Sequence, residues 1–188
     1  QRSVAATIVA RQEFAGYWEY VIDDALFTAP AHPNWGGTGV FNDNGELIGI
    51  GSLHLEQGTD ENSGEHMNMI VPLNLLQPIL SDLMKFGRRK EPPKPWLGLY
   101  ATELEDKIVV VGRSQRGPAR KANLHNGDII DKVAGHQVTS LASLYRLIQG
   151  QGVAGADVAL TIVRDGKTLE MTIPSGDRTA MFRAPKLH

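Results

Sequence analysis

The stretch RGPARKANLHNGDIIDKVAGHQVTSLASLYRLI, residues 116–148, decides the fold of the second half of the chain. It combines a small-residue turn, a short helix, an Asn-Gly-Asp turn, a strand, a Gly-His-Gln turn and a longer helix. Flanking segments such as KIVVVGRS and ADVALTIVRDG are rich in β-branched residues and predict several short strands. The pattern therefore predicts a mainly β domain that carries two helices.

The segment WLGL, residues 96–99, is the candidate binding loop of this domain. A glycine between apolar residues allows several backbone N–H groups to turn towards one point, where they form a nest for a carboxylate. An extended peptide can then add to the sheet beside a helix, with its terminal carboxylate held in the nest. Taken alone, WLGL would better fit the start of a core strand, and the facing helix residues must partly belong to the core. The predicted peptide-binding residues are Trp96, Leu97, Gly98, Leu99, Tyr145 and Ile148.

The prolines and charges of RRKEPPKP, residues 88–95, predict a linker between two domains. We place the first domain at residues 1–89 and the second at residues 90–180. In the first domain, residues 4–9 and 17–28 are rich in β-branched and aromatic residues. They predict two strands, with ARQEFAG as the connection between them.

A hairpin follows in the first domain, because Asn44-Gly45 stands between the apolar segments GVFND and ELIGIGSL. The polar segment EQGTDENSGE then predicts an exposed loop, and MNMIVP predicts a short strand. Apolar residues recur at helical spacing from Leu76 to Phe86, and Gly87 is a natural helix end. The first domain is therefore expected to be a set of strands followed by one amphipathic helix.

Residues 91–175 resemble a PDZ domain of the bacterial HtrA type. The family phrase GSPAxxAGLxxGDxIxxxxGxxV has its counterparts here, in order, in Gly117, Pro118, Ala119, Ala122, Leu124, Gly127, Asp128, Ile130, Gly135 and Val138. This resemblance implies a domain that binds peptide C-termini or exposed segments of unfolded proteins.

Residues 1–87 are similar to the closing part of the second β-barrel of an HtrA-like serine protease. HPNWGGTGVFNDNGELIGI, residues 32–50, aligns without a gap with the family phrase NPGNSGGPLVNxxGEVIGI. MNMIVPLNLLQPILSDLMKFG is similar to the strand and helix that follow in the family. The two resemblances together imply a mainly β chain, in which a partial trypsin-like β-barrel precedes the PDZ domain.

The alignment places Gly36 where the family has its nucleophilic serine. Glycine has no side chain that could attack a carbonyl, so nucleophilic catalysis by the usual route is excluded, although backbone N–H groups of the loop could still form an oxyanion-like site. A shift of the alignment by two residues would make Thr38 the nucleophile, but it breaks the gapless match and adds a crowding methyl group. The family's catalytic His and Asp precede the serine, and a complete first barrel does not fit in the 35 residues before Gly36.

Composition removes several other classes of function. The absence of cysteine excludes disulfides, cysteine catalysis and thiolate metal sites. A net charge of −2 provides no basic field for nucleic acid, and no apolar run reaches the roughly 18 residues of a membrane span. His54 and His66 lie near Asp60 and Glu65, but their spacing matches no recurring metal site. We therefore expect neither a metal nor a cofactor.

These observations lead to three hypotheses. The first is a catalytically inactive HtrA-like serine protease homologue that binds peptide C-termini or unfolded segments through its PDZ domain. The alternative is a fragment of an active serine endopeptidase of protein quality control, whose His and Asp lie upstream and whose nucleophile is Thr38. A third interpretation makes the first domain an unrelated β-domain that holds the PDZ module. The resemblance also implies a place in the periplasm or cell envelope and a homo-oligomer.

Overall fold

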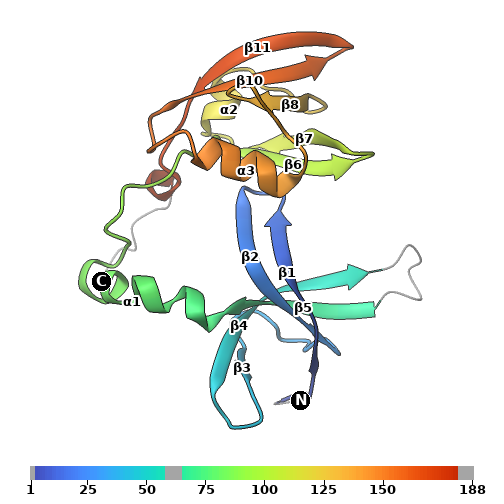
Figure 1. Ribbon diagram of the computed structural model, residues 1–188, viewed down its shortest axis with the longest axis vertical. Coiled ribbons are helices and arrows are strands. Elements are labelled where there is room, and N and C mark those ends of the chain that lie inside the picture. The colour runs from blue at the N-terminus through green and yellow to red at the C-terminus, as the bar shows by residue number, and fades with distance from the viewer. Residues whose placement is uncertain (1–2, 58–64, 182–188) are drawn as a thin grey trace. The chain divides into compact units, whose positions relative to one another are not determined.

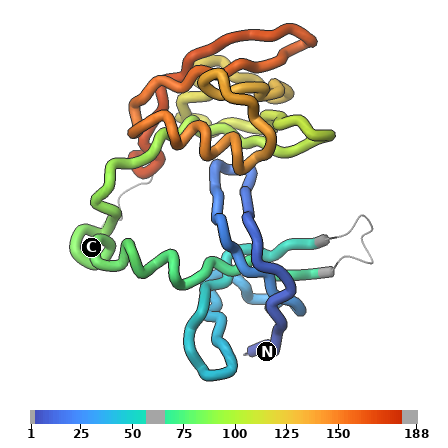
Figure 2. Tube along the Cα trace, in the orientation of Figure 1, coloured from blue at the N-terminus to red at the C-terminus, as the bar shows by residue number. Residues whose placement is uncertain are grey.

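A computed structural model describes residues 3–57 and 65–181 and divides the chain into two compact units (Figures 1 and 2). The first unit consists of the residues up to Phe14 together with Ile22–Lys90. The second consists of Ala15–Val21 together with the residues from Glu91 onwards. The division after Lys90 falls within the predicted linker. The short segment Ala15–Val21 therefore packs with the second unit, although its neighbours in sequence belong to the first.

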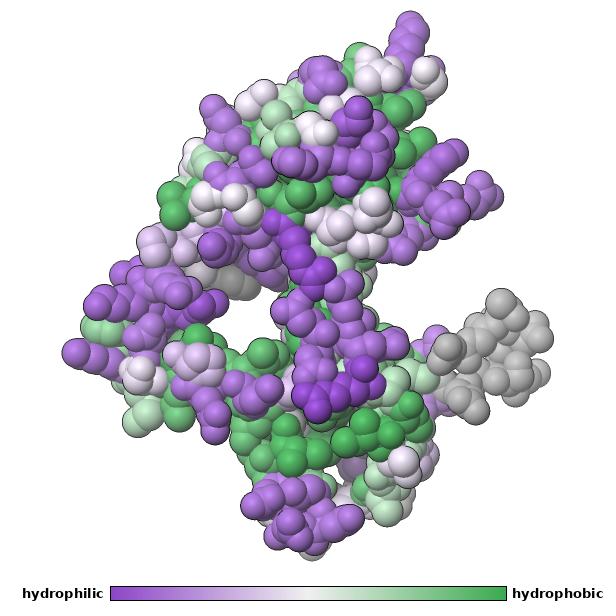
Figure 3. Space-filling model, viewed as in Figure 1, coloured by the Kyte–Doolittle hydropathy of each residue, from purple (hydrophilic) through white to green (hydrophobic). Residues whose placement is uncertain are grey.

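The first unit is built on a five-stranded sheet in the order β1-β2-β5-β4-β3 (Figure 1). Its strands are β1 (Thr7–Gly16), β2 (Tyr20–Ala29), β3 (Gly39–Phe41), β4 (Leu47–Gln57) and β5 (Glu65–Pro72). The core of this unit contains the buried side chains of Ile22, Ala25, Leu26, Phe27, Met69 and Ile70. Apolar side chains also remain exposed on this unit, and Figure 3 shows hydrophobic surface where β3, β4 and the start of β1 lie.

The predicted bounds of the first two strands are wrong. β1 runs through the segment ARQEFAG, which was expected to connect the strands, and the turn comes later, at residues 17–19. β1 is an end strand of its sheet, where charged side chains such as those of Arg11 and Glu13 are tolerated. Glu19 has a φ of 59°, a left-handed conformation that reverses the chain inside an aromatic segment.

The hairpin predicted at Asn44-Gly45 is present and joins β3 to β4. Asn42 organises its five-residue connection, because the Asn42 side-chain oxygen accepts hydrogen bonds from the N–H groups of Asn44 and Glu46. Gly45 has a φ of 77° and donates its N–H to the Asn42 carbonyl. The turn thus follows the chemistry that its asparagine and glycine residues favour.

The helix predicted from Leu76 to Phe86 is only partly α-helical. Two 3₁₀ turns, η1 (Leu73–Leu75) and η2 (Gln77–Ile79), precede the α-helix α1 (Leu80–Phe86). Pro78 lies in η2 and supplies no N–H, so regular α-helical bonding starts only after it. Gly87 ends α1 in a left-handed conformation, as expected. None of the helices in the described parts of the chain is long and apolar enough to cross a bilayer.

The second unit is a six-stranded sheet with two helices (Figure 1). The main path of the sheet runs β11-β10-β8-β7-β6, and β9 pairs with β8. Its strands are β6 (Leu99–Leu104), β7 (Lys107–Arg113), β8 (Ile129–Val133), β9 (His136–Gln137), β10 (Asp157–Arg164) and β11 (Lys167–Pro174). Its helices are α2 (Pro118–Lys121), α3 (Leu141–Gln149) and the 3₁₀ turn η3 (Arg178–Met181). The expectation of a mainly β domain with two α-helices is confirmed.

The helix α3 is fixed at its start by a reciprocal cap. The Ser140 hydroxyl accepts a hydrogen bond from the Ser143 N–H at 3.0 Å, and the Ser140 N–H donates to the Ser143 hydroxyl at 2.8 Å. The inner face of α3 then places Leu144, Tyr145 and Ile148 in the core of the second unit. The cap and this apolar face together position Tyr145 beside the candidate binding loop.

A buried ion pair holds the Asn-Gly-Asp turn to β10. The Asp128 carboxylate is 1% exposed and accepts two hydrogen bonds of 2.7 Å from the Arg164 guanidinium and one of 2.6 Å from the His125 N–H. Burial alone would raise the pKa of Asp128, but Arg164 and the His125 N–H hold this pKa below its usual range. The charged form of Asp128 is therefore the form that the fold stabilises.

Replacement of Asp128 by Asn is expected to lower the free energy of unfolding by about 2–3 kcal/mol at pH 7. Because folding lowers the pKa of Asp128, its contribution is present above the pKa of the unfolded chain and is lost as the pH falls through the folded value. Guanidinium unfolding from pH 7 to pH 3 measures both effects, with the exposed Asp157→Asn as the control. Equal stability of the Asp128 and Asp157 variants would contradict this account.

Candidate functional site

The predicted binding loop is held so that its N–H groups face one way. The carbonyls of Leu97 and Gly98 accept hydrogen bonds from Ala119 (2.8 Å) and Ser114 (2.7 Å). Gly98 has a φ of +73°, and a Cβ at this position would lie 3.0 Å from the Cα of Gly117. Only glycine combines this conformation with so close an approach of backbone. The result is a nest formed by the N–H groups of Leu97, Gly98 and Leu99.

A carboxylate of the chain itself occupies this nest. Glu19, at the tip of the β1–β2 hairpin, belongs to the segment Ala15–Val21 that packs with the second unit. Its Oε1 accepts hydrogen bonds from the N–H groups of Gly98 (2.6 Å) and Leu99 (2.9 Å), and its Oε2 accepts one from Leu97 (3.1 Å). The Glu19 residue is only 7% exposed. The nest thus surrounds a carboxyl group of the same chain, and its binding of a peptide carboxylate stays a prediction.

The hairpin tip also makes a backbone contact with the end strand of the sheet. The Tyr17 carbonyl accepts a hydrogen bond of 3.0 Å from the N–H of Ala101 in β6. β6 ends the strand order, so its outer edge has backbone groups available to an added chain. The Tyr17 and Tyr100 rings meet edge to face, with their centroids 5.8 Å apart. This is the position that an extended peptide would take if it added to the sheet.

The walls of the site are apolar. Leu97, Leu99, Tyr145 and Ile148 are each at most 1% exposed and belong to the core cluster of the second unit. Ala15 and Val21 of the hairpin pack against the same cluster. The structure thus brings these four predicted residues together around the nest. Whether they bind the last side chain of a peptide stays a prediction.

Trp96, the remaining predicted residue, has a different role in this structure. Its backbone forms an isolated bridge with Gly176, with N–H to carbonyl distances of 3.1 and 2.8 Å. Its ring lies close to Gly98, where an added Cβ would be 3.0 Å from two ring carbons. Trp96 therefore supports the loop. In the described part of the chain, it donates no hydrogen bond to the Glu19 carboxylate.

Burial changes the acidity of the groups in the site. Burial raises the pKa of Glu19 to about 7, although the three N–H bonds and the positive charge of Arg178 act to lower it. Burial likewise raises the pKa of Tyr145, and the negative charge of Glu19 raises it further. A backbone hydrogen bond with Glu19 acts to lower this pKa, but the effect of burial is larger. Tyr145 is therefore an interior group of the site that interacts with the hairpin tip.

The loop that aligns with the family's nucleophile loop lies in the first unit. The Gly37 N–H donates to the Gly51 carbonyl at 2.9 Å, and the Gly51 N–H donates to the Thr38 carbonyl at 2.8 Å. A Cβ at Gly51 would lie 2.2 Å from the Trp35 carbonyl oxygen, so glycine is needed in β4 for the loop to pack there. The loop borders a hollow of about 650 Å³ that Trp35 and Thr38 help to line.

The surroundings of the two candidate nucleophile positions, Gly36 and Thr38, differ. A Cβ built on Gly36 meets no atom within 4 Å, so the position is open but holds no reactive group. The Thr38 hydroxyl donates to the Asn34 carbonyl, and no histidine bonds to it among residues 3–57 and 65–181. Three N–H groups of the loop already have acceptors within it or in β4. The Asn34 N–H donates to the His32 ring, the Gly37 N–H to the Gly51 carbonyl, and the Thr38 N–H to the Trp35 carbonyl. These N–H groups therefore do not form an oxyanion hole.

Comparison with known proteins agrees with the geometry. Residues 95–174 match the family model of the PDZ domain. The serine protease Do-like HtrA of Lactobacillus helveticus is 31% identical over 162 residues, which cover 77% of this chain and 38% of the relative. The periplasmic serine endoprotease DegP of Escherichia coli K12 is 28% identical over 149 residues, 73% of this chain and 30% of the relative. The chain is an HtrA-like protein with a PDZ domain.

Solved structures give the same fold for this HtrA-like chain. The HtrA-type protease AlgW with a tripeptide aligns with a TM-score of 0.55 at 21% identity, covering 92% of this chain and 59% of that one. AlgW with a decapeptide aligns with a TM-score of 0.52 at 21% identity, covering 83% and 50%. The mainly β fold class is thereby confirmed. The chain spans well under half the length of the curated relatives named above.

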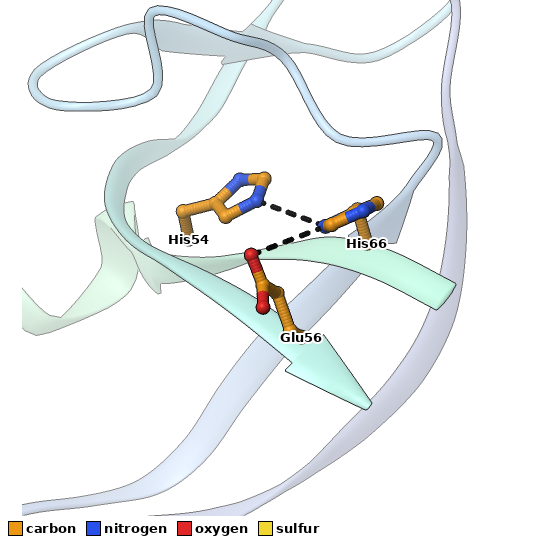
Figure 4. A group of neighbouring side chains, drawn as sticks. All are labelled: His54, Glu56 and His66. Carbon is orange, nitrogen blue, oxygen red and sulfur yellow. Dashed lines mark hydrogen bonds and ion pairs between the residues drawn. The ribbon is translucent and has the colours of Figure 1, made fainter. Parts of the chain in front are cut away.

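Sequence reasoning missed two residues of the site in the second unit and a cluster of three polar side chains in the first unit. Glu19 and Tyr17 were assigned to a strand, and no local pattern marks a carboxylate that binds a loop 78 residues away. His54 and His66 were judged by spacing alone, but they lie side by side with Glu56 (Figure 4). The sheet register brings them together, because His66 pairs with Glu56 across β4 and β5. Asp60, which was considered with them, lies outside the described residues.

The acidity of Glu19 can be measured directly. In protein labelled with ¹³C at glutamate carboxyl groups, one resonance is expected to titrate near pH 7 and to be absent from Glu19→Gln. Because packing of the hairpin tip raises this pKa from about 4.5, that packing is favoured at low pH and weakens as the pH rises from 4.5 to 7. Titration of all glutamates below pH 5.5 would contradict the burial of Glu19.

Proposed function

We propose that this chain binds the C-termini of peptides or unfolded proteins in its PDZ domain. The observation that carries the proposal is the Glu19 carboxylate in the nest of Leu97, Gly98 and Leu99. A peptide C-terminus presents the same two-oxygen anion, so it can accept the same three hydrogen bonds. The edge of β6 and the apolar wall of α3 supply the strand pairing and the pocket that such a peptide needs.

We further propose that the first unit of this chain does not catalyse peptide hydrolysis. Gly36 provides no attacking oxygen, and the Thr38 hydroxyl is bonded to a backbone carbonyl. The first unit then serves as a platform that carries the PDZ domain. By resemblance to the periplasmic endoproteases, we place this function in the periplasm or cell envelope.

Fluorescence anisotropy with labelled C-terminal peptides tests the binding function. Some members of a peptide library with a free carboxylate are expected to bind saturably below about 1 mM. The same peptides with amidated C-termini should bind at least about tenfold more weakly, because they lose charge-assisted hydrogen bonds. Flat titrations for all acid peptides, or equal affinities for acid and amide forms, would overturn the proposal.

Hydrolysis of unfolded casein tests the absence of catalysis. The chain and its Thr38→Ala variant are expected to leave casein intact over hours, as buffer alone does, because no activated nucleophile is present. Product fragments are measured by gel electrophoresis and mass spectrometry. Cleavage by the unmodified chain that disappears in Thr38→Ala would show that Thr38 is the nucleophile after all.

A further inference from the structure

The tip of the β1–β2 hairpin imitates a bound peptide in three respects. It places the Glu19 carboxylate in the nest, pairs the Tyr17 carbonyl with Ala101 of β6, and packs Ala15 and Val21 against the core cluster to which the apolar face of α3 belongs. A C-terminal peptide would need the same nest, the same strand edge and the same apolar wall. The hairpin tip and a peptide therefore cannot occupy the site together.

The backbone conformation of the hairpin tip indicates that the contact of Glu19 with the nest shapes the turn. Glu19 is not glycine and yet has a φ of 59°, a conformation that costs roughly 1 kcal/mol or more. The Trp18 ring stacks on the Tyr20 ring with centroids 5.7 Å apart, and it meets the Tyr17 ring edge to face at 4.8 Å. Three hydrogen bonds to one carboxylate offset the backbone cost. The turn is thus built around the insertion of Glu19.

We propose that the β1–β2 hairpin tip is an internal ligand of the PDZ site, and that a peptide C-terminus binds only after it displaces Glu19. This inference rests on the proposed peptide-binding function and adds its regulation. The apparent affinity for a peptide is the intrinsic affinity multiplied by the fraction of molecules whose site is free. A ligand that favours the free site therefore also releases the hairpin tip.

Peptide affinity of Glu19→Ala measures the competition. The Glu19→Ala variant is expected to bind an acid peptide about tenfold or more tightly than the unmodified chain, because the competing carboxylate is gone. Asp43→Ala is the matched control, since it removes an exposed carboxylate of the first unit and should leave the affinity unchanged. Thermal unfolding of each variant verifies that it is folded, and Glu19→Gln, which keeps the size of the side chain, serves if Glu19→Ala is not.

The outcomes separate this inference from the proposed function. If the unmodified chain and the folded Glu19 variant bind acid peptides equally well, the internal-ligand proposal is wrong and peptide binding stands. If neither binds any acid peptide, the binding function itself is wrong. Tighter binding by the Glu19 variant, with an unchanged Asp43→Ala control, supports both.

A separate observation points to a metal site on the sheet of the first unit. His54 and Glu56 are two residues apart on β4 and share one face, and His66 pairs with Glu56 from β5 (Figure 4). The His54 Nε2 lies 3.2 Å from the His66 Nδ1, which lies 3.8 Å from a Glu56 carboxylate oxygen. In a tetrahedral zinc site with bonds of about 2.1 Å, neighbouring ligand atoms are roughly 3.4 Å apart. The two distances to His66 are close to that spacing, and all three ligand atoms lie within 4.8 Å of one another.

We infer that His54, Glu56 and His66 bind a divalent transition metal ion, with Zn²⁺ as the best match. Two imidazoles and a carboxylate are ligands that Zn²⁺ favours, and water would complete the coordination. Glu56 and His66 are exposed, so the ion reaches them from solvent. The His54 Nδ1 is buried without a partner in the described parts of the chain. Because such a missing partner weakens metal binding by about 10–100-fold, we expect micromolar rather than nanomolar affinity.

Isothermal titration with ZnCl₂ tests the cluster. The unmodified chain is expected to bind one Zn²⁺ per chain, whereas His66→Ala and Glu56→Gln should each lose about tenfold or more in affinity. His125→Ala, which removes a histidine of the second unit, is the matched control, and MgCl₂ is the control for non-specific cation binding. No saturable Zn²⁺ binding, or an affinity that His66→Ala leaves unchanged, would show that the two histidines form only a hydrogen-bonded pair.

Discussion

Three backbone N–H groups that converge on one carboxylate are the constraint around which the second unit is organised. Gly98 makes the convergence possible because it combines a positive φ with close contact to Gly117. The carbonyls on the other side of the loop are bonded to Ser114 and Ala119, so the loop cannot rotate without breaking those hydrogen bonds. The loop is therefore held by hydrogen bonds other than those to the carboxylate, which lowers the ordering cost of binding.

The two units differ in how many of the functional groups implied by the family resemblance they contain. The second unit has a nest of N–H groups, a strand edge and an apolar helix face, which are the elements that the proposed peptide site needs. In the first unit, Gly51 allows the loop that aligns with the family's nucleophile loop to pack on β4, and Gly36 is the residue that the alignment places opposite the serine. This contrast underlies the proposal that the chain binds peptides without hydrolysing them.

How much of this could be predicted from sequence depended on how local each signal is. The phrase at residues 116–148 predicted the PDZ unit because its turns and helices are specified within a few residues, and the nest followed from Gly98. The contact of Glu19 with the nest could not be predicted, because its partner loop lies 78 residues away and its aromatic neighbours suggest a strand. His54 and His66 were missed for a related reason: their proximity depends on the β4–β5 register, which shifts between Gly51 and Leu53.

Hydrogen exchange at the amides of Leu97, Gly98 and Leu99 tests most directly whether the nest is a carboxylate site that the chain fills itself. Measured by NMR without peptide, these amides should be protected in the unmodified chain and should exchange faster in Glu19→Ala. An acid peptide should restore their protection in the variant, and the matching amide should not. Equal exchange in the two proteins, with no response to the acid peptide, would contradict the account.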